Sequence, residues 1–261
     1  MSNASDKVVE VAITSIRPWT DHLFSFKTER PKGFKFSAGQ FARLGLPAQA
    51  GSDQLVWRAY SIASGPFDEE LEYYSIVVPG GAFTSQLKDL RVGDRLLMER
   101  QNHGFLTTDQ FPLGGDLWML ASGTGLAPFL SMLQDPSCWE SFDRLILVHS
   151  VRAKTELAYQ DWIESELPQH PIFGAWAQEK LVYQPVVTRE PSAYPSKRIP
   201  ELIASGELAR LVGRPLSLTA SKCMLCGNPE MVSDTKKSLK DQGFVTSRRS
   251  RPGQIATENY W

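Results

Sequence analysis

The run Arg58-Ala59-Tyr60-Ser61 combines side chains that together can seat a planar cofactor carrying a phosphate. An arginine binds phosphate through a planar fork of N–H donors. Tyr60 follows Arg58 by two residues and so lies on the same side of a strand, where its ring offers a surface for stacking. The Ser61 hydroxyl can then hydrogen-bond the edge of the stacked ring. This set of side chains fits a flavin.

A glycine-rich turn, Ser122–Pro128, lies between an apolar strand-like segment, Asp116–Ala121, and an apolar helix-like segment, Phe129–Leu133. Glycine permits a tight turn and a close approach of the backbone to a ligand. Pro128 stands where the standard dinucleotide fingerprint has glycine, although proline suits the first position of a helix. The strand–turn–helix context is the one that the fingerprint requires. The turn therefore predicts a nucleotide site.

Three arginines follow predicted strands or precede a predicted helix at the same edge of one sheet: Arg152, Arg189 and Arg198. Each contact between an arginine and a phosphate contributes roughly 1.5–3 kcal/mol when it is charge-assisted. Any one of these arginines, taken alone, is better explained as a solvated loop or cap residue. The three together favour a phosphate site.

The elements that must position these residues differ between the two halves of the chain. The first half shows short β-type runs separated by turns, which predicts an antiparallel barrel or sandwich. Its expected strands are Lys7–Ile16, Leu23–Lys27, Gln40–Leu46, Arg58–Ala63, Leu71–Val78 and Arg95–Arg100, with one short helix at Thr84–Leu90.

In the second half, strands alternate with amphipathic helices, which predicts a parallel sheet with ligands beyond the carboxyl ends of its strands. The expected strands are Asp116–Ala121, Arg144–Val151, Lys180–Thr188 and Lys222–Gly227. The expected helices are Pro128–Leu133, Glu156–Glu166, Pro200–Leu208 and Pro229–Gln242. Residues 107–115, rich in Thr, Gly and Pro, are expected to link the two halves.

Composition narrows the class of protein further. The chain has 261 residues, of which 42% are hydrophobic and 22% charged, as in ordinary globular proteins. Its formal net charge of -1 gives no global field that would attract nucleic acid. Three cysteines argue against a disulfide framework and for a reducing compartment. Because no segment reads as a signal peptide or approaches membrane-spanning length, we expect a cytoplasmic protein with no membrane partner. From the net charge we expect no nucleic-acid partner, and we expect the protein to be a monomer.

Nearly the whole chain resembles the compact bacterial type of ferredoxin (or flavodoxin)–NADP reductase. The segments that carry the resemblance, in chain order, are Arg58–Ser61, Tyr74, Val78–Thr84, Gly123–Gly125 with Pro128, Val151-Arg152, Thr188-Arg189, Arg198–Pro200, Cys226–Pro229 and Glu258–Trp261. The resemblance implies a two-domain fold: an antiparallel FAD barrel (1–106), the linker 107–115, and a Rossmann-like α/β NADP domain (116–261). The tail of the second domain would return to the FAD.

The resemblance also assigns the site residues. FAD would be held by Arg58, Ala59, Tyr60, Ser61, Tyr74, Ala82, Phe83, Thr84, Thr124, Tyr260 and Trp261. NADP(H) would be bound by Gly123, Gly125, Val151, Arg152, Thr188, Arg189, Arg198, Gly227, Asn228 and Pro229. Catalytic positioning would fall to Tyr60, Ser61, Cys226 and Glu258. In the implied reaction, NADPH gives a hydride to the flavin, and single electrons pass to ferredoxin or flavodoxin, an acidic carrier.

Some features leave alternatives open. Cys223-x-x-Cys226 has the spacing of a zinc or redox pair, but there is no second pair, and a strand would place the two side chains on different faces. The basic run Arg248–Arg251 is either a solvated turn or a contact for the carrier. An oxygenase reductase with a separate iron–sulfur partner is one rival, since three cysteines cannot ligate a plant-type cluster. A non-enzymatic flavin or nucleotide sensor is the other rival.

Overall fold

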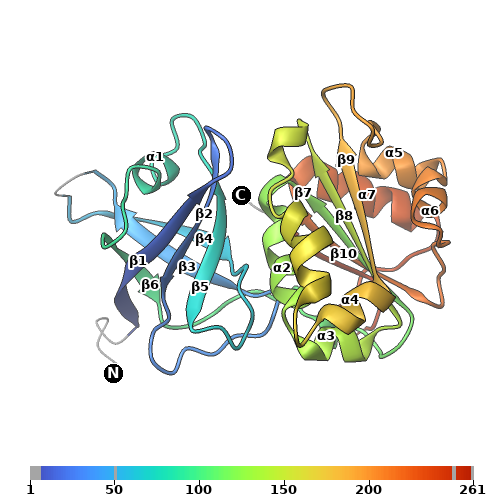
Figure 1. Cartoon of the computed structure of the whole chain (residues 1–261), viewed down its shortest axis with the longest axis horizontal. Coiled ribbons are helices and arrows are strands. Elements are labelled where there is room, and N and C mark those ends of the chain that lie inside the picture. The colour runs from blue at the N-terminus through green and yellow to red at the C-terminus, as the bar shows by residue number, and fades with distance from the viewer. Residues whose placement is uncertain (1–6, 50–51, 249–250, 260–261) are drawn as a thin grey trace.

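A computed structural model of the chain describes residues 7–49, 52–248 and 251–259 (Figure 1). Its strands form two separate sheets, one on each side of the predicted linker 107–115. No helix in the described ranges combines the length and the apolar character needed to cross a membrane.

The first sheet is antiparallel, with the order β4-β3-β6-β1-β2-β5. Its strands are β1 (Val8–Pro18), β2 (Leu23–Glu29), β3 (Phe41–Pro47), β4 (Leu55–Ser61), β5 (Glu70–Ile76) and β6 (Arg95–Glu99), and the short helix α1 (Thr84–Leu87) precedes β6. A bridge between Ile62 and Tyr73 connects the two end strands, so the sheet closes as the predicted barrel. Inward-facing side chains such as Phe26 and Leu44 are almost fully buried and fill its interior.

The second sheet is parallel, with the order β11-β10-β7-β8-β9. Its strands are β7 (Asp116–Ser122), β8 (Arg144–Val151), β9 (Leu181–Val187), β10 (Ser221–Gly227) and β11 (Ile255–Asn259). The first four match the predicted strands closely, which confirms the parallel α/β fold. The fifth, β11, was not predicted, because only two of its five residues are buried and its sequence is mostly polar.

Helices cover both faces of the second sheet (Figure 1). One face carries α2 (Ala127–Leu133), α3 (Pro136–Ser141) and α4 (Gly174–Lys180), and the other carries α5 (Ile199–Ala204), α6 (Glu207–Val212) and α7 (Pro229–Asp241). The helix α7 begins where the Asn228 side chain accepts hydrogen bonds from the N–H groups of Glu230 and Met231. Such a cap satisfies donors that the first turn of a helix leaves without a partner.

The face that carries α2 also packs against the barrel. Leu23, Ala38, Ala63 and Tyr74 of the barrel are buried in the same cluster as Phe129 and the other apolar residues of α2. The two sheets therefore share one hydrophobic core, and the ends of β4 and β5 lie against the second sheet.

The predicted helix Glu156–Glu166 is wrong over its first half. Lys154–Glu156 forms a single 3-10 turn, and helical structure resumes only at Gln160, just before the π-helical turn Trp162–Glu166. Between them, Tyr159 has a φ of 62°, which no α-helix accepts. The predicted helix Pro200–Leu208 is likewise divided into α5 and α6, because Gly206 is left-handed with a φ of 70°.

The three cysteines are buried. Cys138 and Cys226 lie in the core on the α2 side of the second sheet, whereas Cys223 lies in the core on the α7 side. The prediction that Cys223 and Cys226 face opposite sides of a strand is confirmed, and the pair is not arranged as a metal or redox site.

Candidate functional site

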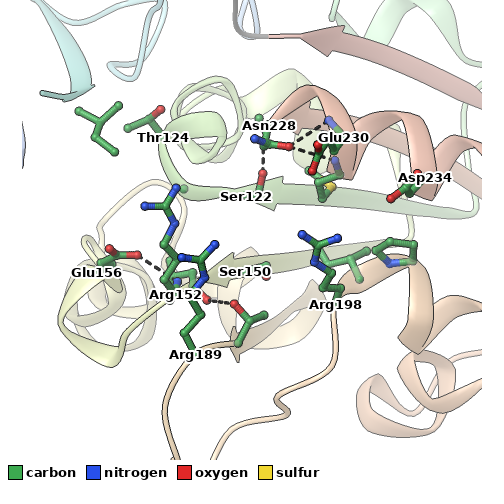
Figure 2. A pocket seen from close by; sticks show the side chains of 18 of the residues that line it. Ser122, Thr124, Ser150, Arg152, Glu156, Arg189, Arg198, Asn228, Glu230 and Asp234 are labelled. Carbon is green, nitrogen blue, oxygen red and sulfur yellow. Dashed lines mark hydrogen bonds between the residues drawn. The ribbon is translucent and has the colours of Figure 1, made fainter. Parts of the chain in front are cut away.

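A pocket of about 240 Å³ opens at the carboxyl ends of β7, β8 and β10. The three arginines that the sequence predicted to converge, Arg152, Arg189 and Arg198, all line it. Figure 2 shows their side chains on one side of the pocket, facing Ser122 and Asn228 on the other. This edge of the sheet is the one at which parallel α/β folds bind ligands.

Backbone pairing beyond the ends of β8 and β9 places two of these arginines. The Thr188 N–H and hydroxyl both donate to the Val151 carbonyl at 3.0 Å, and the Arg189 N–H donates to the Arg152 carbonyl at 2.9 Å. Arg198 immediately precedes α5. No described carboxylate forms an ion pair with any of the three guanidinium groups, so their positive charges remain available to a ligand.

The opposite wall is a close approach between the glycine turn after β7 and the end of β10. A Cβ on Gly227 would lie 2.4 Å from the Ser122 hydroxyl oxygen, which accepts a hydrogen bond from the Asn228 N–H at 3.0 Å. A Cβ on Gly125 would lie 2.3 Å from the Cys226 carbonyl oxygen. The glycines are therefore required by the tight contact between these two segments.

A buried histidine of β8 contacts the glycine turn after β7. His149 Nε2 lies 3.1 Å from the Gly123 carbonyl oxygen, and burial lowers the pKa of His149 to about 4. The imidazole is therefore neutral near pH 7, with its proton on Nε2 so that it can donate to Gly123. The sequence contained this histidine at the carboxyl end of a strand, but nothing in its spacing indicated the contact.

A second, smaller cavity lies between β4, β5 and the glycine turn. It is lined by Ala59, Tyr60, Ser61, Tyr74, Ser75, Ile76 and Thr124, of which Ile76 and Thr124 also line the arginine pocket. The Tyr60 and Ser75 hydroxyls lie 3.0 Å apart, and burial raises the pKa of Tyr60 to about 12. The Tyr74 hydroxyl is buried and has no hydrogen-bond partner among the described residues. A polar ring edge in this cavity would satisfy that hydroxyl, so the residues present fit a flavin.

Ser61 meets Glu258 at the rim of this cavity. The Ser61 hydroxyl donates to Glu258 Oε2 at 3.4 Å, across 197 positions of sequence. Burial raises the pKa of the Glu258 carboxyl to about 7, and the Ser61 hydrogen bond opposes the rise. Glu258 reaches this place because β11 pairs with β10, opposite Cys226.

The turn before α1 contains the residues predicted to hold the FAD pyrophosphate. Thr84 Oγ1 accepts a hydrogen bond from the Val78 N–H at 3.0 Å and so closes the turn. Within the described residues, the N–H groups of Ala82 and Phe83 have no hydrogen-bond acceptor. Arg58 is exposed, and its Nη1 donates only to the neighbouring Trp57 carbonyl among the described contacts. These donors remain available to a phosphate.

Some predicted site residues lie elsewhere. The Cys226 side chain is fully buried, and the strand contributes Gly227 and Asn228 to the pocket instead. Gly125 and Pro229 do not line the pocket. Tyr260 and Trp261 lie outside the described residues. Conversely, the pocket includes three acidic residues that the sequence did not single out: Glu156, Glu230 and Asp234.

Comparisons with known proteins agree with this geometry. Residues 13–101 match an oxidoreductase FAD-binding domain, and residues 119–237 match an oxidoreductase NAD-binding domain. The chain is 42% identical to a ferredoxin–NADP reductase of Pseudomonas aeruginosa over 248 residues, which cover 94% of this chain and 95% of the relative. It is 39% identical to the flavodoxin/ferredoxin–NADP reductase of Escherichia coli over 251 residues, which cover 95% of this chain and 97% of the relative.

A solved structure is similar over the same length. The crystal structure of a ferredoxin NADP⁺ reductase from Neisseria gonorrhoeae, with bound FAD and NADP, superposes with a TM-score of 0.88 at 36% identity. The match covers 98% of this chain and 99% of that one. With both domains matched by family models, and with relatives of this identity along nearly its whole length, the chain belongs to the bacterial type of ferredoxin/flavodoxin–NADP reductases.

Proposed function

We propose that this chain is an FAD-dependent enzyme that transfers electrons between NADPH and a ferredoxin or flavodoxin. The observation that carries the proposal is the pocket lined by three arginines without ion-pair partners among the described residues, directly beside the cavity at Tyr60. A nucleotide with an extra phosphate fits the arginine pocket, and a flavin ring fits the cavity at Tyr60. Relatives from the same family are named for ferredoxin and flavodoxin.

The arginines bind the 2′-phosphate of NADPH in this proposal. A phosphate carries more than one negative charge, and the three guanidinium groups neutralise it through charge-assisted hydrogen bonds. Val151 and Thr188 line the same wall, and Gly123, Gly227 and Asn228 line the opposite one. Gly125 and Pro229 support that wall through the turn and the start of α7.

The barrel holds FAD. Tyr60 would stack on the ring beside Ala59, Tyr74 would donate its hydroxyl, and Arg58 with the N–H groups of Ala82, Phe83 and Thr84 would bind the phosphates. When bound, FAD supplies the exchange between a hydride and single electrons. Tyr260 and Trp261 are proposed to cover the FAD at the end of the chain.

Four residues position the reacting groups. Tyr60 and Ser61 line the small cavity, and Glu258 is held to Ser61 by a hydrogen bond. Cys226 shapes the nicotinamide side through the backbone at the end of β10, because its side chain is buried. Positioning of this kind is what hydride transfer requires of the protein.

The carrier and the setting are also proposals. Arg248 and Arg251 pair through their backbones, with the N–H of each donating to the carbonyl of the other at 3.0 and 2.9 Å. Both residues are exposed, and we propose them as contacts for an acidic carrier. We further propose that residues 107–115 link the two domains and that the protein is a cytoplasmic monomer.

A steady-state assay tests the proposal. The FAD-loaded protein should oxidise NADPH with ferredoxin or flavodoxin as acceptor and should prefer NADPH to NADH by a factor of about 10²–10⁴, from roughly 3–5 kcal/mol of differential binding. Turnover with artificial acceptors alone would instead favour the reductase component of an oxygenase.

The variant Arg198→Ala isolates the arginine pocket. It should raise KM for NADPH and leave KM for NADH nearly unchanged, since NADH lacks the 2′-phosphate. Equal efficiency with the two nucleotides in the parent protein would disprove the phosphate site.

A further inference from the structure

The Glu156 carboxylate connects the barrel to the arginine pocket. Its Oε1 lies 3.1 Å from His22 Nε2, and its Oε2 accepts a hydrogen bond from the Arg152 N–H at 3.0 Å. His22 lies in the turn between β1 and β2 of the barrel and does not line the pocket, whereas Arg152 does. One carboxylate therefore joins a residue of the barrel to a proposed phosphate-binding residue of the second domain. Figure 2 shows Glu156 beside Arg152 at the edge of the pocket.

The barrel holds His22 in the orientation that this contact needs. Thr20 Oγ1 accepts hydrogen bonds from the N–H groups of His22 and Leu23 at 3.3 and 3.1 Å, and it lies 3.4 Å from His22 Nδ1. When the Thr20 hydroxyl donates to Nδ1, the imidazole proton resides on Nε2, from which it donates to Glu156. The turn thus presents one donor toward the second domain.

The segment that follows Glu156 is fixed to the same side of the barrel. Tyr159 donates its hydroxyl to Glu72 at 2.7 Å, and its ring centroid lies 4.7 Å from that of Trp19 and 5.4 Å from that of Tyr74. Tyr159 is also the described non-glycine residue with a positive φ. A left-handed backbone is strained for a bulky residue, and such strain persists only where surrounding contacts impose it. Residues 152–159 are therefore held at both ends, by the pocket and by the barrel.

We propose that Glu156 is a positioning residue that makes recognition of the phosphate by Arg152 depend on the docking of the two domains. The proposal rests on the proposed function of the pocket. The backbone of Arg152 is fixed on both sides, by Glu156 at its N–H and by the Arg189 N–H at its carbonyl. If the contact between His22 and Glu156 is lost, Glu156 no longer holds the Arg152 N–H firmly. The Arg152 guanidinium then samples a wider range of positions before the phosphate binds.

The opposite sign is expected if Glu156 acts only through its charge. A carboxylate in a phosphate pocket repels the ligand, so its neutralisation would then tighten binding of NADPH. The structure favours positioning because both carboxylate oxygens already accept hydrogen bonds.

The test compares KM and kcat for NADPH and NADH in the FAD-loaded full chain. We expect His22→Ala and Glu156→Gln each to raise KM for NADPH by about three- to tenfold, and to raise KM for NADH much less, because NADH lacks the 2′-phosphate. The variant His22→Gln should keep most of the parent affinity, because its amide nitrogen can donate from near the place of Nε2. The double variant His22→Ala/Glu156→Gln should be no weaker than the worse single variant, since both remove one contact.

A matched control lies in the same segment. Glu164 is exposed and accepts a hydrogen bond only from Gln160 among the described contacts, so Glu164→Gln should change neither KM. Tighter NADPH binding in Glu156→Gln, or additive effects in the double variant, would overturn the positioning role. Unchanged KM values in His22→Ala would overturn it too.

Arg198→Ala separates the phosphate pocket from the coupling through Glu156. If that variant fails to affect KM for NADPH, the phosphate pocket itself is wrong. If it weakens NADPH while the His22 and Glu156 variants do not, the pocket stands and the coupling through Glu156 is wrong.

Discussion

The fold shifts the pKa of the Glu258 carboxyl, and this shift can be tested by experiment. Burial raises the pKa of its carboxyl to about 7 from an ordinary value of 4.5. The folded protein thus favours the protonated acid, and ionisation of Glu258 opposes folding. Stability is consequently lost as the pH rises from about 4.5 to about 7, and the loss persists above that range.

The variant Glu258→Gln should remove this loss. Near pH 5 the melting temperatures of the parent and the variant should be similar, because Glu258 is then mostly protonated. Near pH 8 the variant should melt at the higher temperature. Thermal unfolding at both pH values measures the difference, with Glu140→Gln, which changes an exposed carboxylate on α3, as the control. A difference between parent and Glu258→Gln that is the same at both pH values would contradict the raised pKa.

The sequence predicted the place of a residue where that place follows from its own strand or motif. Arg152, Arg189 and Arg198 were expected at one edge because parallel strands place their carboxyl ends together, and all three line one pocket. Glu156 and Tyr159 could not be found in this way. Their partners, His22 and Glu72, lie more than eighty positions away in the barrel, and no local pattern records such a contact.

At the scale of elements, the glycine turn after β7 offers two positions with different requirements. Gly123 has a φ of 52°, and a Cβ added there would have no neighbouring atom within 4 Å, so only its backbone conformation resists substitution. Gly125 lies against β10, whose Cys226 carbonyl oxygen would be 2.3 Å from an added Cβ. A backbone carbonyl cannot rotate away as a side chain does.

We expect Gly125→Ala to lower the free energy of unfolding by about 3 kcal/mol, and Gly123→Ala by about 1 kcal/mol. Gly125→Ala separates the turn from β10 and so should also weaken nucleotide binding. Urea unfolding of the two variants and titration with NADP⁺ measure both effects. The reverse order of stabilities would show that β10 yields easily and that the turn is not held by this contact.

The elements that the sequence predicted best are the strands with a clear apolar pattern. In the second sheet, β7, β8 and β10 are short, almost wholly buried runs. The helices α3 and α4 were not predicted, although the Asp135 side chain that caps α3 is a signal that could have been used. Tyr159 and Gly206 ended helices through left-handed conformations, one of which depends on contacts with the barrel.

At the scale of the whole molecule, the shared core joins the two domains into one folding unit. Leu23, Ala63 and Tyr74 of the barrel are buried together with α2, so separation of the domains would expose this apolar surface to water. We therefore expect a single cooperative unfolding transition rather than two.

Two probes can test this cooperativity, because nearly all helices belong to the second domain and the proposed flavin site to the barrel. Far-UV circular dichroism follows the helices, and flavin fluorescence follows release of FAD. The two thermal midpoints should coincide in the parent protein. Release of FAD well before loss of the helices would mean that the barrel unfolds independently.

The buried cysteines can be used as probes of local opening, because they lie on different sides of the parallel sheet. Burial raises the pKa of the Cys138 and Cys223 thiols far above their ordinary range, so both stay protonated and inaccessible to alkylating reagents in the native state. Cys138 lies on one side of the parallel sheet and Cys223 on the other. The rate at which each thiol is alkylated therefore measures how often the structure around that cysteine opens in the intact enzyme.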